Sequence, residues 1–171
     1  LILIAKNKYA AQQLERQRAN HTLSRVYLAL AEGHWTNQSK SGLIDRPIEK
    51  VPECFNRYQV ADTGRPSRTE YEVLSEFTYT ETPFSLVRLK LQTGRTHQIR
   101  VHMASLSHPL LGDSIYGHEG FLGFDRAALH SFEITCQLPG HQDLAVFSSE
   151  MPEDFQKMIA ESKKLSSTLI W

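Results

Sequence analysis

The residues of this chain that are best suited to chemistry lie in a single stretch, Thr93-Gly-Arg-Thr-His-Gln-Ile-Arg-Val-His-Met103. Two arginines and two histidines follow a glycine there. A guanidinium group binds a carboxylate or a phosphate through paired hydrogen bonds, and an imidazole exchanges a proton near neutral pH. We therefore expect the function of the chain to concentrate in this stretch.

Two predicted elements position these side chains. Polar and apolar residues alternate over Phe84–Gln92, which predicts a half-buried strand that Gly94 ends. Thr96 is expected to be the N-cap of a helix that continues to about Ser105. The apolar stripe of this helix that faces the core consists of Ile99, Met103 and Leu106. Arg100 lies about 100° from the start of that stripe, so its guanidinium should sit at the edge of the core, held rigidly yet able to reach a cleft.

Patterns elsewhere predict an α+β fold, in which a mostly antiparallel, mixed sheet is flanked by a few helices. The other expected strands are Leu1–Ala5, which reads as buried, Ser24–Ala31, Thr69–Phe77, Leu129–Leu138 and Leu144–Ser148. The other expected helices run from Asn7 or Lys8 to about Arg18 and from Pro152 to about Lys164. Residues 34–68 are expected to be loops with one or two short strands. Tyr27 alternates with aliphatic residues, so it should face the opposite side of its strand.

A length of 171 residues with 40% hydrophobic residues predicts one domain, residues 1–171. Nineteen basic residues balance nineteen acidic ones, so any attraction for nucleic acid must come from local clusters. Such clusters are Arg57, Arg65 and Arg68, and Arg88, Lys90, Arg95 and Arg100; solvated surface charge is the commoner explanation of such groups. The two cysteines match no zinc or redox spacing, and the chain has neither a signal-peptide core nor a membrane-spanning apolar run, so we expect a soluble, cytoplasmic protein.

Eight histidines raise the question of a metal site, but their spacing does not support one. His97 and His102 lie on different faces of the predicted helix, and the other histidines lack the spacing of a tetrahedral site. The glycines of Gly117–Gly123 are not followed by the Lys-Ser/Thr pair of a phosphate-binding loop, and the chain has no Gly-x-Ser-x-Gly sequence. We expect neither a metal site, nor a nucleotide-cradling loop, nor a serine hydrolase.

The stretch that begins at Thr93 and a second one, His108-Pro-Leu-Leu-Gly-Asp-Ser-Ile-Tyr-Gly117, closely resemble the RluA-type pseudouridine synthases. Further segments agree in sequence order, and they are Arg25-Val-Tyr-Leu-Ala-Leu30, Gly42-Leu-Ile-Asp-Arg-Pro47, Arg68-Thr-Glu-Tyr-Glu-Val73 and Ala128-Leu-His130. The resemblance covers nearly the whole chain, and motifs that recur together in order are far more specific than a lone motif. It implies a pseudouridine synthase catalytic domain, which detaches uracil from ribose at N1 and rejoins it through C5 in structured RNA, without cofactor or metal.

The same resemblance implies an aspartate nucleophile in a His-Arg-Leu-Asp segment that is followed by Thr-Ser-Gly. In similar proteins the counterpart of Leu1–Ala5 directly follows this segment, so the nucleophile is expected before Leu1. Residues 1–171 are therefore expected to be a partial catalytic domain that is inactive by itself. The aspartates of the chain lie outside such a motif and receive no catalytic role; they are Asp45, Asp62, Asp113, Asp125, Asp143 and Asp154.

By resemblance, two catalytic residues lie in the chain. Arg100 matches the arginine that pairs with the catalytic aspartate and lowers its pKa, and Tyr27 matches the tyrosine that lies against the flipped uracil and helps to move a proton. The matching substrate-binding positions are Leu129, which closes the base pocket, and Arg95, Thr96 and His97, which orient the loop or contact phosphate. A purely structural role stays open for four of them: an ion pair for Arg100, half-burial in a strand for Tyr27, core packing for Leu129 and surface exposure for Arg95.

A rival function is a non-catalytic RNA-binding protein that retains this fold. A His-Arg-Leu-Asp run encoded directly before Leu1 favours the enzyme, and its absence favours the binding protein. A metal hydrolase that uses the histidines is a third alternative, which stoichiometric zinc in the purified protein would support. The expected partner is structured RNA, either ribosomal or transfer RNA, and not a membrane.

Overall fold

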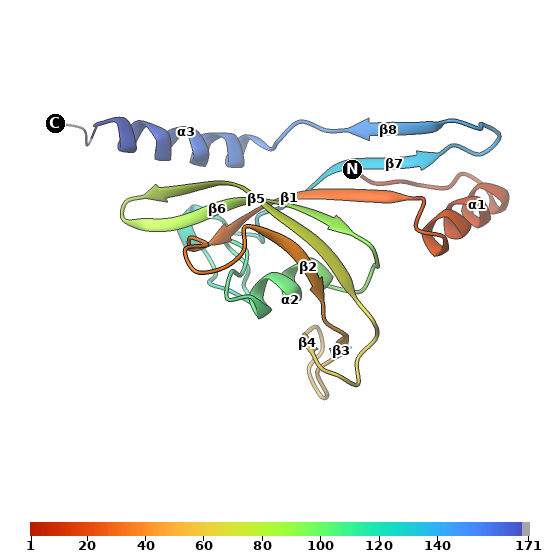
Figure 1. Cartoon of the computed structure of the whole chain (residues 1–171), viewed down its shortest axis with the longest axis horizontal. Coiled ribbons are helices and arrows are strands. Elements are labelled where there is room, and N and C mark those ends of the chain that lie inside the picture. Colours follow the sequence, from red (N-terminus) through yellow and green to blue (C-terminus); the bar gives the residue numbers. More distant parts are fainter. Residues whose placement is uncertain (169–171) are drawn as a thin grey trace.

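The computed structural model describes residues 1–168 of the chain, with side chains through Lys164. A six-stranded sheet in the order β2-β5-β6-β1-β7-β8 runs through the molecule, and β3 and β4 form a separate pair (Figure 1). The strands are β1 (Ser24–Glu32), β2 (Ser41–Asp45), β3 (Ile48–Lys50), β4 (Tyr58–Val60), β5 (Arg68–Tyr79), β6 (Thr82–Leu91), β7 (Leu129–Gln137) and β8 (Leu144–Ser148). The helices are α1 (Lys8–Ala19), α2 (Gln98–Ser105) and α3 (Glu153–Thr168), with a short 3-10 helix at Phe121–Gly123. The predicted α+β class is confirmed, and the strand pairings of the described residues are antiparallel throughout.

The longest strands, β5 and β6, form the antiparallel pair that their alternating residues predict. Thr80 and Glu81 connect them with φ angles of 43° and 67°, because a tight hairpin turn matches the twist of its strands when its central residues have positive φ. Strand β1 continues the sheet beyond β6, with Leu28 opposite Arg88 of β6 and opposite His130 of β7. The strand that carries Tyr27 therefore lies in the middle of the sheet.

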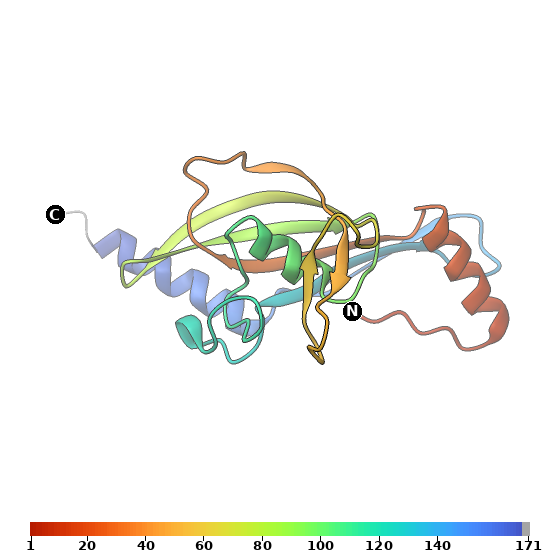
Figure 2. The ribbon, with the colours of Figure 1, turned by 90° about the horizontal axis from the view of Figure 1, so that it is seen from below.

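Helices α2 and α3 cover opposite faces of this sheet (Figure 1). Successive residues of β1 alternate between the two faces, because side chains of a strand point to opposite sides. Leu28 belongs to the apolar cluster that contains Phe155 of α3, whereas Ala29 belongs to the cluster that contains Ile99 of α2. Tyr27 packs against the α2 cluster, on the side opposite to Leu28, as predicted. Seen from the α2 side, helix α2 crosses the middle of the sheet and the β3–β4 pair lies beside it (Figure 2).

Most of the other predicted elements are present with small shifts at their ends. The Asn7 side chain caps α1 by accepting a hydrogen bond from the backbone N–H of Ala10 (2.8 Å), and Asn20 is the C-cap. Strands β7 and β8 match their predictions, and α3 continues to Thr168. Residues 34–68, expected to hold one or two short strands, hold three of them, namely β2, β3 and β4.

The prediction of a buried strand over Leu1–Ala5 is wrong. In the described structure this segment is irregular, and the Ile2 and Ile4 side chains are 86% and 77% exposed. One hydrogen bond joins it to the sheet, from the Leu1 amino group to the carbonyl oxygen of Ser131 (3.2 Å). A short apolar run becomes a strand only where a neighbouring strand satisfies its backbone groups, and here the segment lies beside α1 instead.

Three properties bear on possible ligands and surroundings. Within the described residues, His, Cys, Asp and Glu side chains form no group of three that could hold a metal ion. No helix of residues 1–168 is long and apolar enough to cross a membrane. Both cysteines are free thiols; Cys54 is exposed and Cys136 is buried.

Candidate active site

The turn from β6 into α2 is organised by the buried side chain of Gln98. Its Oε1 accepts hydrogen bonds from the Thr93 hydroxyl (2.8 Å) and the Arg95 backbone N–H (3.0 Å). Its Nε2 donates to the Arg68 carbonyl oxygen (2.9 Å) and to Oγ1 of Thr69 (3.0 Å). The amide thereby uses its full hydrogen-bonding capacity and ties the turn to β5.

The expected N-cap of α2 is wrong by one residue. Thr96 is exposed, and the helix begins at Gln98 with His97 at the cap position. His97 has a left-handed backbone (φ 55°), and its side chain makes no capping bond. Since the Gln98 amide already accepts from the turn backbone, the turn does not need a threonine hydroxyl for that purpose.

A second buried contact fixes α2 to the sheet. His102 is fully buried, and its Nδ1 lies 2.8 Å from the hydroxyl of Thr69 while its Nε2 lies 2.9 Å from the carbonyl oxygen of Arg46. A carbonyl oxygen only accepts, so Nε2 carries the proton and Nδ1 accepts from Thr69. Burial lowers the pKa of His102 and keeps the imidazole neutral. This anchoring fixes the helix that carries Arg100, which lies two residues before His102.

Arg100 forms a bidentate ion pair with Asp113. Its Nε donates to Oδ2 at 2.7 Å and its Nη2 donates to Oδ1 at 2.6 Å. The Asp113 side chain is fully buried and that of Arg100 is 17% exposed, so Arg100 lies at the edge of the core, as the helical periodicity predicts. Burial alone would raise the pKa of Asp113, but hydrogen bonds from Arg100 and from the backbone N–H groups of Ile115 and Tyr116 lower it overall.

His97 and Tyr116 complete the surroundings of Arg100. Nη1 of Arg100 lies 3.1 Å from Nε2 of His97, whose Nδ1 lies 3.0 Å from the hydroxyl of Tyr116. Since an arginine only donates, Nε2 accepts and Nδ1 donates to Tyr116, which also accepts from the Tyr58 backbone N–H (2.9 Å). Desolvation and the charge of Arg100 lower the pKa of His97, in agreement with this neutral tautomer. The guanidinium also lies 5.0 Å from the centre of the Tyr116 ring.

Tyr27 and Leu129 lie on the same face of the sheet as α2. Both pack against the apolar cluster that contains Ile99, the residue before Arg100. Tyr27 pairs with Ser131 across the β1–β7 ladder and lines a cavity of about 380 Å³ between the sheet, α1 and the N-terminal segment. The amino group of Leu1 bonds to Ser131, so the N-terminus lies beside Tyr27. Arg100 and Tyr27 thus share a face of the sheet, while the Arg100 guanidinium is held by Asp113 and His97.

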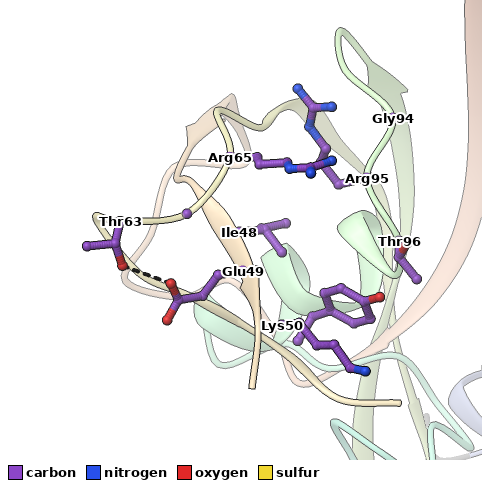
Figure 3. A pocket seen from close by; sticks show the side chains of 10 residues that line it. Ile48, Glu49, Lys50, Thr63, Arg65, Gly94, Arg95 and Thr96 are labelled. Atoms are coloured by element: carbon purple, nitrogen blue, oxygen red, sulfur yellow. Dashed lines mark hydrogen bonds between the residues drawn. The ribbon is translucent and has the colours of Figure 1, made fainter. Parts of the chain in front are cut away.

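Arg95 and Thr96 line a different cavity, of about 490 Å³, between the β3–β4 pair and the turn before α2 (Figure 3). Nε of Arg95 donates to the carbonyl oxygen of Pro66 (3.2 Å), which steadies the side chain at the cavity wall. Of the three expected positions in this turn, Arg95 and Thr96 thus line the cavity, whereas His97 lies beside Arg100.

The second predicted basic cluster does not form one surface. Arg88 and Lys90 lie on the face of β6 opposite to α2, 4.0 Å and 3.9 Å from the carboxylates of Glu72 and Glu70. Arg95 lies beyond the strand, beside α2. The cluster is split because residues of even number in β6 face away from α2, whereas the turn carries the chain back toward it.

Sequence reasoning missed three residues that surround Arg100 and His97, namely Asp113, Tyr116 and Tyr58. Asp113 and Tyr116 belong to a stretch that resembles the family, but the sequence alone does not show which partner each side chain has. Their partners are many residues away in the chain, and only the folded path of residues 106–117 over α2 brings them together. Tyr58 had no local signal at all.

The comparisons with known proteins show which family this chain resembles along its length. The sequence profile of the family described as RNA pseudouridylate synthase matches residues 1–105. Ribosomal large subunit pseudouridine synthase D of Nitrosomonas europaea is 35% identical over 96% of this chain and 48% of its own length. An uncharacterised RNA pseudouridine synthase of Bacillus subtilis, YhcT, is 38% identical over 92% of this chain and 50% of its own length. The chain spans about half the length of the curated relatives it matches.

A solved structure supports the same conclusion. Human RNA pseudouridylate synthase domain containing 1 superimposes with a TM-score of 0.70 and 26% identity, covering 93% of this chain and 73% of the human one. The sheet and the helices described above are thus those of an established family. The chain belongs to the RNA pseudouridylate synthase family.

Proposed function

We propose that this chain is the greater part of a catalytic domain that converts uridine to pseudouridine in structured RNA. The observation that carries this proposal is how Arg100 is held. Of the five N–H groups of a guanidinium, Asp113 accepts two and His97 accepts one. One N–H on Nη1 and one on Nη2 remain, and two such groups can bind a second carboxylate in bidentate fashion.

This geometry reconciles a structural role of Arg100 with a catalytic one. The ion pair with Asp113 is structural, yet it leaves the guanidinium preorganised to bind the catalytic aspartate that the resemblance implies. Such a pair lowers the pKa of that aspartate and directs it toward the sugar or the base. Asp113 itself is not the nucleophile in this proposal, because its carboxylate is fully buried and already accepts from Arg100 and two backbone N–H groups.

The other residues have complementary roles in the proposal. Tyr27 lies against the everted uracil and helps to move the proton that C5 loses when the new bond forms, and Leu129 closes the base pocket. Arg95, Thr96 and His97 hold the RNA backbone or the turn that contacts it. Bringing the uracil out of a helix costs a few kcal/mol, which contacts to the flanking RNA must offset.

The curated relatives named for the ribosomal large subunit favour ribosomal RNA as the substrate, and we place the reaction in the cytoplasm. The test is to delete the gene that encodes this chain and to map pseudouridines in ribosomal and transfer RNA. We expect at least one pseudouridine to be lost and to return with the wild-type gene. An unchanged pseudouridine pattern, together with RNA binding by the purified protein, would instead establish the non-catalytic binding protein.

A further inference from the structure

We propose that the cavity between the β3–β4 pair and the turn before α2 is a second nucleotide subsite, which binds a phosphodiester and stacks a base of the RNA strand beside the target uridine. This inference rests on the proposed function and adds residues to it. The new residues are Lys50, Tyr58 and Arg65, which line the cavity together with Arg95 and Thr96.

The positive charge of this cavity is not neutralised from within the protein. Lys50, Arg65 and Arg95 come from three separate segments, and in residues 1–164 none of them is within ion-pair distance of a carboxylate. The acidic residue at the cavity, Glu49, accepts hydrogen bonds from Thr63 (2.8 Å) and Gln59 (3.1 Å). Figure 3 shows Glu49 turned toward Thr63 and the Arg65 side chain reaching across the cavity toward Arg95.

Two arginines next to this turn are, by contrast, paired within the protein. Arg68 is paired with Asp45 at 2.9 Å, and Arg100 is paired with Asp113. Unpaired guanidinium and ammonium groups that surround one hollow fit an anion with several acceptor oxygens, and a phosphodiester of RNA is such an anion.

The backbone around the cavity is closely packed, so these cations are not on a free loop. Arg65 and Ile48 exchange backbone hydrogen bonds of 2.8 Å and 2.9 Å. A Cβ atom on Gly64 would lie 2.6 Å from the carbonyl carbon of Ile48, so only glycine allows the two segments to approach this closely. Arg95 is fixed from the other side by its bond to the Pro66 carbonyl oxygen.

Tyr58 connects the cavity to the surroundings of Arg100. Its ring packs edge-on against His97, with 5.6 Å between ring centres, and its backbone N–H donates to Tyr116. An aromatic ring beside unpaired cations is the combination that binds single-stranded nucleic acid, in which the base stacks and the phosphate is held by charge. Since His97 bonds to Arg100, a nucleotide in this cavity lies next to the uridine at the catalytic site.

The first test measures binding of the 171-residue chain to a short single-stranded oligouridine over a range of salt concentrations. The variant K50Q/R65Q should bind about threefold or more weakly, with the slope of log K against log salt shallower by about 0.7, the value of one phosphate contact on a single strand. The matched control R88Q/K90Q also removes one lysine and one arginine, from the opposite face of the sheet. Equal effects of the two double variants, at unchanged melting temperatures, would overturn the proposal.

The second test concerns stacking. Tyr58→Leu should weaken oligouridine binding about threefold or more while leaving the salt slope unchanged, because stacking on an aromatic ring releases no counterion. Tyr9→Leu, at an exposed tyrosine of α1, is the control and should bind like the wild type. Binding of Tyr58→Leu that equals the control would contradict a stacked base.

These outcomes are separate from the test of the proposed function. If the gene deletion leaves all pseudouridines in place but K50Q/R65Q still loses its phosphate contact, the isomerase proposal fails and the subsite stands. If pseudouridines are lost but both double variants bind alike, the subsite fails and the isomerase stands.

Discussion

At the scale of single residues, the proposed function depends on how Asp113 holds Arg100. A buried carboxylate that accepts two guanidinium bonds and two backbone bonds has little freedom to move, and neither has its partner. An arginine fixed in this way need not lose side-chain entropy when it binds a second carboxylate. We therefore propose that Asp113 is a positioning residue for Arg100.

Replacing Asp113 with alanine should lower the free energy of unfolding by about 3 kcal/mol at neutral pH, because Arg100 is then left largely buried without its partner. Chemical denaturation measures this change. The control Asp45→Ala removes the exposed pair with Arg68 and should cost less than about 1 kcal/mol. Equal losses in the two variants would show that the burial of Asp113 has no energetic consequence.

Acid should remove the stabilisation that Asp113 provides. Its pKa is lowered in the folded protein, so the stabilisation is complete above the ordinary carboxyl pKa of about 3.9 and is lost as the pH falls through the folded-state value. The difference in unfolding free energy between the wild type and Asp113→Ala should therefore narrow below about pH 4. If the difference in unfolding free energy stayed constant into strong acid, Asp113 would not be the group whose protonation removes this stabilisation.

At the scale of elements, periodicity in the sequence was enough to predict most strands and helices, because each buries one face. It failed where long-range contacts decide the structure. Thr96 is a good N-cap by residue type, but the turn is held by Gln98, whose partners in β5 are 29 and 30 residues away in the sequence. Leu1–Ala5 has the composition of a buried strand, but composition cannot show whether a neighbouring strand is available to pair with it.

The contact between α2 and β5 should be sensitive to His102. His102→Leu should lower the unfolding free energy by about 2 kcal/mol, because it leaves the Thr69 hydroxyl and the Arg46 carbonyl oxygen without their partner. Since burial lowers the pKa of His102, folding favours the neutral form, and the wild type should lose stability as the pH falls below about 6.5. Over the same pH range, His102→Leu should lose less stability than the wild type.

Denaturation curves near neutral pH and in mild acid measure the unfolding free energy of His102→Leu and of the wild type, and its change with pH. The control His118→Leu changes a side chain that is 72% exposed and bonded to Glu32, and it should cost less than about 1 kcal/mol. If both histidine variants lose the same stability, the buried contact does not anchor α2.

At the scale of the whole molecule, the residues assigned to function lie on the α2 side of the sheet, whereas α3 covers the other side. The family resemblance pointed to Arg100 and Tyr27 from the sequence. It could not indicate Tyr58, Lys50 or Arg65 as neighbours, because only the folded chain brings the β3–β4 pair close to the turn before α2. The candidate site therefore depends on the fold as well as on the sequence motifs.

The purified 171-residue chain should form no pseudouridine in RNA. Its aspartates lie outside the family motif of the nucleophile, and Asp113, which contacts Arg100, is fully buried. Chromatographic analysis of nucleosides after incubation with a ribosomal RNA transcript measures this directly. Oligouridine binding by the same sample serves as the control that the chain is folded. If this chain formed pseudouridine, one of its own residues would supply the nucleophile, and the assignment to the aspartate of the family motif would be refuted.

The most direct test of the central claim is to replace Arg100 in the gene that encodes the chain and to map pseudouridines in the deletion strain that carries the altered gene. Arg100→Lys retains the charge but has no planar fork to bind two carboxylates at once. The account predicts that the wild-type gene and the control Arg88→Lys restore the lost pseudouridines, whereas Arg100→Lys does not at equal protein levels. Full restoration by Arg100→Lys would contradict it.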